Sequence, residues 1–178
     1  LPEHLREGIS MLPHEAEIYI NDVLAVKEKF EEMIDVKLGF EVDFPRFDTF
    51  DHSYLTDPRI DYIIGSVHFM DDWGFDNPDQ FYRFEERPID DIYRDFYRLV
   101  EGLVDSRFCD IIGHFDLIKK FGHRSEGDMS EIVRRIAKKI SKNGTVAEIN
   151  TSGLYKPIGE IYPSDSILKI FFEEDVPV

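Results

Sequence analysis

Apolar residues recur along the chain with two different periods, and segments of the two kinds alternate. Within 88–106, Ile89, Ile92, Phe96 and Val100 recur every three or four positions, which indicates an amphipathic helix. Short runs rich in Val, Ile and Phe lie between the helical segments and indicate strands. The pattern predicts helices over 13–34, 88–106, 129–142 and 164–174. It predicts strands over 36–44, 59–69, 108–115 and 145–150.

Several residues are placed to begin or end these elements. Pro13 suits a first helical turn, where its missing N–H costs nothing. Asp128 and Glu131 are spaced as a capping box before the helix over 129–142, and Gly144 is placed to end that helix. Pro177 is placed to begin a further strand.

Alternating strands and helices favour an α/β fold, in which βαβ units build a parallel sheet. A chain of 178 residues fits one domain with a sizeable core, so we expect residues 1–178 to form a single domain. Two predicted loops, 45–58 and 70–87, are longer than ordinary connections. Loops of this length are usually functional or disordered.

The charge balance narrows the classes of partner. The chain has 21 basic and 37 acidic residues and a net charge of −16, so we expect neither nucleic acid nor an anionic membrane to bind it. It contains no apolar run of membrane-spanning length, and no secretory signal begins it. The single cysteine, Cys109, rules out an internal disulfide and fits a reducing compartment, so a cytoplasmic location is expected. The pattern does not indicate an oligomeric state.

Polar side chains stand where the predicted strands end. Glu41 closes the first strand, His68 the second and His114 the third, while Glu148 and Asn150 close the fourth. In a parallel α/β barrel these ends meet on one face. One carboxylate and two imidazoles converging there would suit zinc, iron or manganese.

A less specific interpretation of the two histidines must be kept beside this one. A single histidine at a strand end is more often a hydrogen-bonded structural residue than a metal ligand. Gly65 and Gly113, which precede the two histidines, would let neighbouring backbones approach closely. Cys109 begins its strand, which favours burial over catalysis.

Four segments together resemble one known family. They are "LGFEVDF", "IIGSVHF", "IIGHFDLIKKF" and "EINTSGLYKPIGEIYPS". In order and spacing they are similar to the histidinol-phosphatase branch of the polymerase-and-histidinol-phosphatase (PHP) superfamily. The resemblance implies a distorted (β/α)7 TIM-like barrel that holds two or three divalent metal ions (zinc, iron or manganese) at the strand ends. It also implies hydrolysis of a small-molecule phosphate ester, L-histidinol phosphate, in histidine biosynthesis.

The resemblance also assigns roles to individual residues. Glu41 resembles a glutamate that bridges two metals, and His68 and His114 resemble the histidines on the second of them. The family's His-x-His and Asp-His before this region and its Asp-x-His after it do not occur here. We therefore expect the chain to be an internal piece of a longer domain that lacks its first and last strands. "LPEHLREG" is similar to the family's segment after the Asp-His, and "FFEEDVPV" to its segment before the Asp-x-His.

A phosphate dianion needs local positive charge in so acidic a protein. The candidate substrate-binding residues are Arg83, Arg87, Lys119, Lys120, Arg124 and Lys156, with Asn150 at a strand end. Each of the basic residues could instead be a solvated surface charge. The family usually has arginine where this chain has Tyr155, which puts that phosphate contact in doubt. The cationic, aromatic end of histidinol could meet Asp71, Asp72, Trp73 or Asp76.

Two other functions remain open on the sequence alone. Another phosphoesterase of the superfamily, acting on a small molecule or as an exonuclease, would share the metal ligands. An exonuclease should show a basic, aromatic-lined groove, against which the net charge of −16 argues. A degenerate barrel serving as a non-catalytic binding module would retain ligand residues without holding metal.

Overall fold

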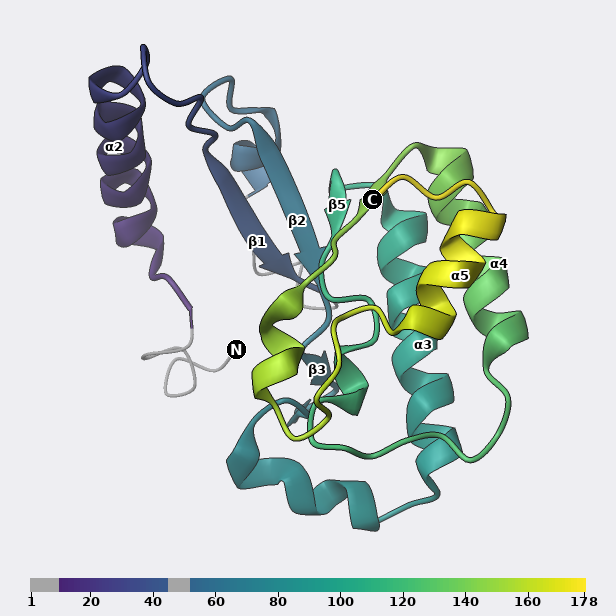
Figure 1. Cartoon of the computed structure of the whole chain (residues 1–178). Helices are drawn as coiled ribbons and strands as arrows, with labels where there is room; N and C mark the ends of the chain where they lie inside the picture. The colour runs from purple at the N-terminus through teal and green to yellow at the C-terminus, as the bar shows by residue number, and fades with distance from the viewer. Residues whose placement is uncertain (1–9, 45–51) are drawn as a thin grey trace.

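The computed structural model describes residues 10–44 and 52–178 (Figure 1). The helices are α2 (Pro13–Lys29), α3 (Ile89–Ser106), α4 (Ser130–Asn143) and α5 (Asp165–Glu173). The strands are β1 (Gly39–Asp43), β2 (Tyr62–Ser66), β3 (Phe69–Met70), β4 (Trp73–Gly74), β5 (Ile111–Ile112) and β6 (Val146–Ala147). Short 3₁₀ helices are η2 (His52–Thr56), η3 (Pro78–Glu85), η4 (Leu117–Lys119) and η5 (Thr151–Tyr155). None of the helices in these residues is long and apolar enough to cross a membrane.

Four strands form one parallel sheet in the order β1-β2-β5-β6. Ile64 of β2 pairs with Glu41 of β1 and with Ile111 of β5, and Ile111 pairs with Val146 of β6. The carboxyl ends of all four strands therefore lie along one edge, as the α/β prediction requires. The described residues leave this sheet open and do not close it into a barrel.

The helices flank the sheet unequally. Helices α3, α4 and α5 lie together on one side of it, whereas α2 stands apart beyond β1 (Figure 1). The α3–α4 side contains the core, where Phe96, Val100, Ile112, Ile136 and Ile140 are almost fully buried. Burial of their apolar surface is the main force that holds this layer on the sheet.

Several predicted elements are shorter in the structure. The helix over 13–34 ends at Lys29 because Phe30 leaves the helical region, with φ −114° and ψ 13°. The strand over 59–69 divides: β2 ends at Ser66, and Phe69–Met70 instead pairs in antiparallel fashion with Trp73–Gly74. Residues 70–87 are thus a folded hairpin and a 3₁₀ helix. Residues 1–9 and part of the other long loop, 45–51, lie outside the described residues.

The predicted helix ends are correct in two of three cases. Pro13 begins α2, and Gly144 ends α4 in the left-handed region at φ 74° with its N–H bonded to the Ile140 carbonyl. The capping-box prediction is wrong, because the N-cap is Met129 and makes no side-chain cap bond. The Asp128 carboxylate lies one residue earlier and accepts a hydrogen bond from the Ser130 N–H at 2.8 Å.

The C-terminal residues lie against the outer edge of β6. The Ala147 N–H donates to the Pro177 carbonyl at 2.8 Å, although no strand is assigned there. The prediction that Pro177 begins a strand is therefore met by one ladder-like hydrogen bond only.

Candidate metal centre

The carboxyl end of β1 supplies two acidic side chains to one face of the sheet. Side chains alternate along a strand, so Glu41 and Asp43 share a face while Val42, between them, is buried on the other. Glu41 is half exposed and Asp43 mostly buried. The two carboxylates therefore lie at the edge where the parallel strands end.

The two histidines come after the next two strands. His68 comes two residues after β2 and His114 two residues after β5, and their rings meet edge to face with centroids 4.8 Å apart. Glu41 Oε1 lies 3.3 Å from His114 Nε2 and 3.7 Å from His68 Nε2. One donor atom from each of the three residues falls within 4.8 Å of the others. The structure therefore brings together the three side chains that the sequence singled out.

The charges around this cluster favour a cation. The hydrogen bond to His114 lowers the pKa of Glu41 to about 2, against the opposing effect of burial. Burial lowers the pKa of His68, but its hydrogen bond to Asp43 and the charges of Asp43, Asp76 and Glu41 outweigh burial and raise it. The carboxylates thus stabilise positive charge at the imidazoles, and a bound cation would supply the same charge.

A carboxylate from a neighbouring strand holds the backbone of each histidine. Asp43 Oδ1 accepts the His68 N–H at 3.0 Å and lies 3.3 Å from His68 Nδ1. Glu148 accepts the His114 N–H at 2.7 Å and also a hydrogen bond from the Asn150 amide at 3.1 Å. Glu148 was noted from the sequence, whereas Asp43 was missed, although its alternation with Glu41 could have revealed it.

The two glycines permit close approach, as expected from the sequence. A Cβ on Gly113 would lie 2.5 Å from Ser66 Oγ, and one on Gly65 would lie 2.7 Å from Cys109 Sγ. Cys109 is buried, and burial raises the pKa of its thiol to about 12, which agrees with a structural role.

Most candidate substrate-binding residues already contact carboxylates. Arg83 pairs with Asp72 at 3.1 Å, and Arg87 pairs with Asp95. These ion pairs hold both arginines beside η3 and the start of α3, within one stretch of the chain. Both arginines are therefore already paired with carboxylates of the same stretch of chain.

Lys119 and Arg124 share one acidic partner. Lys119 is buried and bonds Asp116 at 2.8 Å, the Ile161 carbonyl at 2.8 Å and Glu160 at 3.3 Å. Arg124 is more than half exposed and bonds Glu160 at 2.6 Å. A phosphate at Arg124 would have to compete with Glu160, whereas Lys119 is enclosed by protein groups.

The remaining candidates, Asn150 and Lys156, differ in their contacts. Asn150 is linked to His114 through Glu148, as described above, and its side-chain oxygen accepts the Ser152 N–H at 2.9 Å. Lys156 is exposed at the end of η5. Tyr155, beside it, is 88% exposed and so is free to contact a ligand.

The residues suggested for the histidinol end have different partners in the structure. Trp73 is buried, and its indole N–H bonds the Gln80 carbonyl at 3.2 Å, so that suggestion is wrong for Trp73. Asp72 pairs with Arg83. Asp76 lies close enough to raise the pKa of His68 and is bonded by Lys120 at 3.1 Å.

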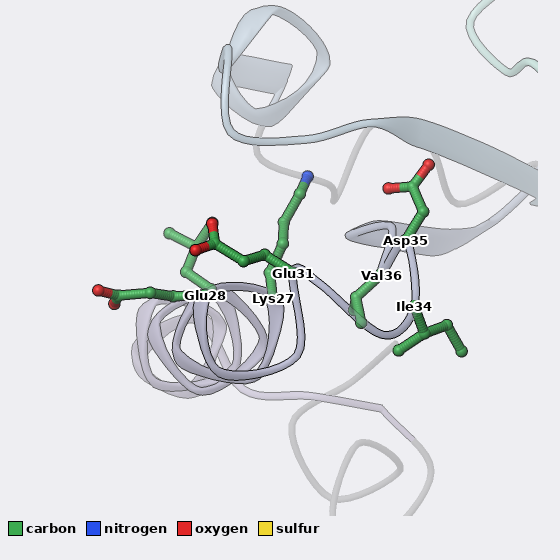
Figure 2. A pocket seen from close by; sticks show the side chains of 7 residues that line it. Lys27, Glu28, Glu31, Ile34, Asp35 and Val36 are labelled. Carbon is green, nitrogen blue, oxygen red and sulfur yellow. The ribbon is translucent and has the colours of Figure 1, made fainter.

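A separate cavity lies among the described residues. It has a volume of about 470 Å³ and is lined by Leu24, Lys27, Glu28, Glu31, Ile34, Asp35 and Val36. Figure 2 shows these side chains around the end of α2 and the segment that leads into β1. This is the amino end of β1, so the cavity is separate from the metal-ligand cluster at the carboxyl end.

The chain is similar to known proteins. A protein named "Probable histidinol-phosphatase" in Deinococcus radiodurans is 39% identical over 160 residues, which is 89% of this chain and 61% of that protein. The "Histidinol-phosphatase" of Bacillus subtilis is 26% identical over 99% of this chain and 73% of its own length. The chain thus spans about three fifths of the first of these relatives.

A solved structure and a family match agree with these relatives. The crystal structure of a candidate histidinol phosphatase, hisK from Listeria monocytogenes, superposes with a TM-score of 0.79 and 22% identity, covering 94% of this chain and 70% of that one. The PHP domain family matches residues 8–152. The resemblance inferred from the four sequence segments is therefore confirmed, and the chain belongs to the PHP domain family.

Proposed function

We propose that the full-length protein is a metal-dependent phosphomonoesterase that hydrolyses L-histidinol phosphate to L-histidinol and phosphate in histidine biosynthesis. The observation that carries the proposal is the convergence of Glu41, His68 and His114 at the carboxyl ends of parallel strands. The relatives named as histidinol-phosphatases support the choice of substrate. Because this chain spans only part of those relatives, the proposal concerns the whole protein.

The donor set fits a borderline divalent cation. Ligand atoms about 2.0–2.2 Å from zinc in a tetrahedral site lie roughly 3.3–3.6 Å from one another. Glu41 Oε1 stands 3.3 and 3.7 Å from the two Nε2 atoms, and the three donor atoms lie within 4.8 Å of one another, so one cation could be held by Glu41, His68 and His114 once the two imidazoles move closer together. We propose zinc, iron or manganese here, with one or two further cations held by donors outside this cluster.

The cation and the chain would have separate tasks. A bound divalent cation would activate water at neutral pH and neutralise phosphoryl oxygens. Glu41, His68 and His114 would fix the place of that cation. Among the candidate basic residues, Arg124 and Lys156 are both exposed and could meet a phosphate dianion from solvent.

The loop that contains Asp76 would meet the end of the substrate that carries the ammonium group. Asp76 lies near His68 and is the candidate for the ammonium group of histidinol. Its charge is shared with Lys120, so the substrate would have to compete for it. Tyr155 stands where the family usually has arginine, and Arg124 is the candidate to replace that phosphate contact.

The test is phosphate release by the full-length protein from L-histidinol phosphate. We expect chelation to abolish release and added zinc or manganese to restore it. His68→Ala should lower kcat/KM by orders of magnitude, because it removes a donor to the cation that activates water. Lys139→Ala is the matched control and should retain activity, because Lys139 lies on α4 and pairs with Glu101 and Asp105 of α3.

Two outcomes would favour the other functions. Equal or faster turnover of unrelated phosphate esters or of oligonucleotides would indicate another phosphoesterase of the family. A full-length protein that folds but binds no divalent cation would indicate a non-catalytic binding module.

A further inference from the structure

The two histidines are held in different ways. Both have their backbone N–H bonded by a carboxylate from an adjacent strand, Asp43 for His68 and Glu148 for His114. In the part of the chain that the structure describes, only His68 also has a carboxylate beside its ring Nδ1, where Asp43 Oδ1 lies 3.3 Å away. Among the described residues, the carboxylate that approaches the His114 ring is Glu41, and it does so on the Nε2 side.

Asp43 is well suited to fix a ring. Its Oδ1 accepts the His68 backbone N–H and also lies within hydrogen-bond distance of the ring Nδ1, so the backbone and the imidazole of His68 contact the same atom. Its Oδ2 is buried and has no hydrogen-bond partner among the described residues. Burying a carboxylate oxygen without a hydrogen-bond partner costs free energy of folding. We infer that an aspartate at position 43 is tolerated because of the contacts that its Oδ1 makes with His68.

The contact decides which ring nitrogen carries the proton. An ionised carboxylate can only accept hydrogen bonds, so a neutral His68 that bonds Asp43 must carry its proton on Nδ1. The lone pair is then on Nε2, the atom that lies 3.7 Å from Glu41 Oε1. A histidine with the other tautomer would direct an N–H at the place of the cation.

We propose that Asp43 is a positioning residue that holds His68 in the Nδ1–H tautomer and thereby sets the affinity of the cluster for a divalent cation. The part that concerns affinity rests on the proposed metal site. The part that concerns the tautomer does not, because it derives from the contact in the metal-free protein. Partners of this kind typically contribute about 10–100-fold to metal affinity.

Asp43→Asn is the informative substitution. The Asn side chain keeps an oxygen that can accept the His68 backbone N–H, so the loop after β2 should retain its conformation. A neutral amide oxygen is a weaker acceptor than a carboxylate for the ring N–H, so the ring proton should move toward Nε2, where it would obstruct the cation. Asp43→Ala removes both contacts and serves as the second variant.

The tautomer is measured first, on the full-length, metal-free protein. Long-range ¹H–¹⁵N spectra at alkaline pH report which nitrogen of each neutral histidine is protonated. We expect Nδ1–H at His68 in the wild type and a shift toward Nε2–H in Asp43→Asn, with the His114 signals unchanged. A wild-type His68 with its proton on Nε2, or an unchanged tautomer in Asp43→Asn, would overturn the proposal.

Zinc affinity is measured next, by competition with a chromophoric chelator. We expect Asp43→Asn and Asp43→Ala to weaken zinc binding by about 10–100-fold. Asp35→Asn is the control, because Asp35 is an exposed carboxylate near the amino end of β1. Unchanged affinity in both Asp43 variants would overturn the role of Asp43 in metal binding. Failure of the wild type to bind zinc would instead refute the metal site, while the tautomer measurement would still decide the role of Asp43.

Discussion

Carboxylates are used differently in the helical layer and at the strand ends. In the layer of α3, α4 and α5 they pair with basic side chains: Glu101 bonds Arg135 at 2.8 Å and Lys139 at 2.9 Å, and Arg134 bridges Glu173 and Glu174. These pairs join one helix to the next and neutralise the acidic charge where it occurs.

At the strand ends the acidic charge is not neutralised in this way. The contacts of Glu41, Asp43 and Glu148 with the described residues are to imidazoles, backbone N–H groups and an amide, and none is to lysine or arginine. With a net charge of −16, the chain has more carboxylates than basic residues, and several of its basic residues pair with carboxylates of the helical layer. The difference indicates that the strand ends are adapted to a cation from solution, whereas the helical carboxylates are adapted to the chain's own cations.

The largest effect should come from removing one charge at the strand ends. Glu41→Gln should weaken zinc binding by at least about 100-fold, because it replaces an anionic donor with a neutral amide. Glu101→Gln removes one charge from the helical layer and should leave zinc affinity unchanged. Isothermal titration of the full-length variants makes the comparison. Equal losses in the two would show that general acidity, rather than the cluster, attracts the cation.

A second pair of substitutions separates packing from binding. Gly113→Ala places a Cβ 2.5 Å from Ser66 Oγ, and Gly65→Ala places one 2.6 Å from Leu103 Cδ1. Each should lower the free energy of unfolding by about 1–3 kcal/mol through overpacking. Gly113 adjoins His114, so only Gly113→Ala should also weaken zinc binding. Urea denaturation and zinc titration test this, and a comparable loss of affinity in Gly65→Ala would contradict it.

The helical layer and the sheet also differ in how well their elements could be predicted from the sequence. The helix over 88–106 was correct to within one residue, because its apolar face is set by a local period and packs on the core. The strand over 108–115 was too long, since only Ile111–Ile112 pairs on both sides. An apolar run does not show how many of its residues find a partner, because neighbouring strands decide that.

The site divides in a similar way. Convergence of Glu41, His68 and His114 could be predicted from a rule about the ends of parallel strands and needed no knowledge of packing. The surroundings of Lys119 and Arg124 could not be predicted, because their partner Glu160 is about 40 residues away and is brought near only by the fold. Residues that a topology rule places could therefore be found from the sequence, whereas ion pairs that tertiary contacts decide could not.

The smallest effect should come from removing the charge of Glu101 in the helical layer. Hydrogen bonds from Arg135 and Lys139 lower the pKa of Glu101 to about 2, from an ordinary value of 4.5. Because the pKa of Glu101 is lower in the folded state, its charge stabilises the protein at pH values above the ordinary pKa of 4.5. This stabilisation is lost as the pH falls toward 2. After allowance for solvent screening, Glu101→Gln should reduce the free energy of unfolding by about 1 kcal/mol at neutral pH. The gap between wild type and variant should narrow as the pH falls below about 4.5, which urea denaturation at several pH values would measure. Glu85→Gln, at an exposed carboxylate of η3, is the control and should change little at any pH. A gap that stays constant or widens in acid would show that Glu101 stabilises the α3–α4 contact through packing and not through its charge.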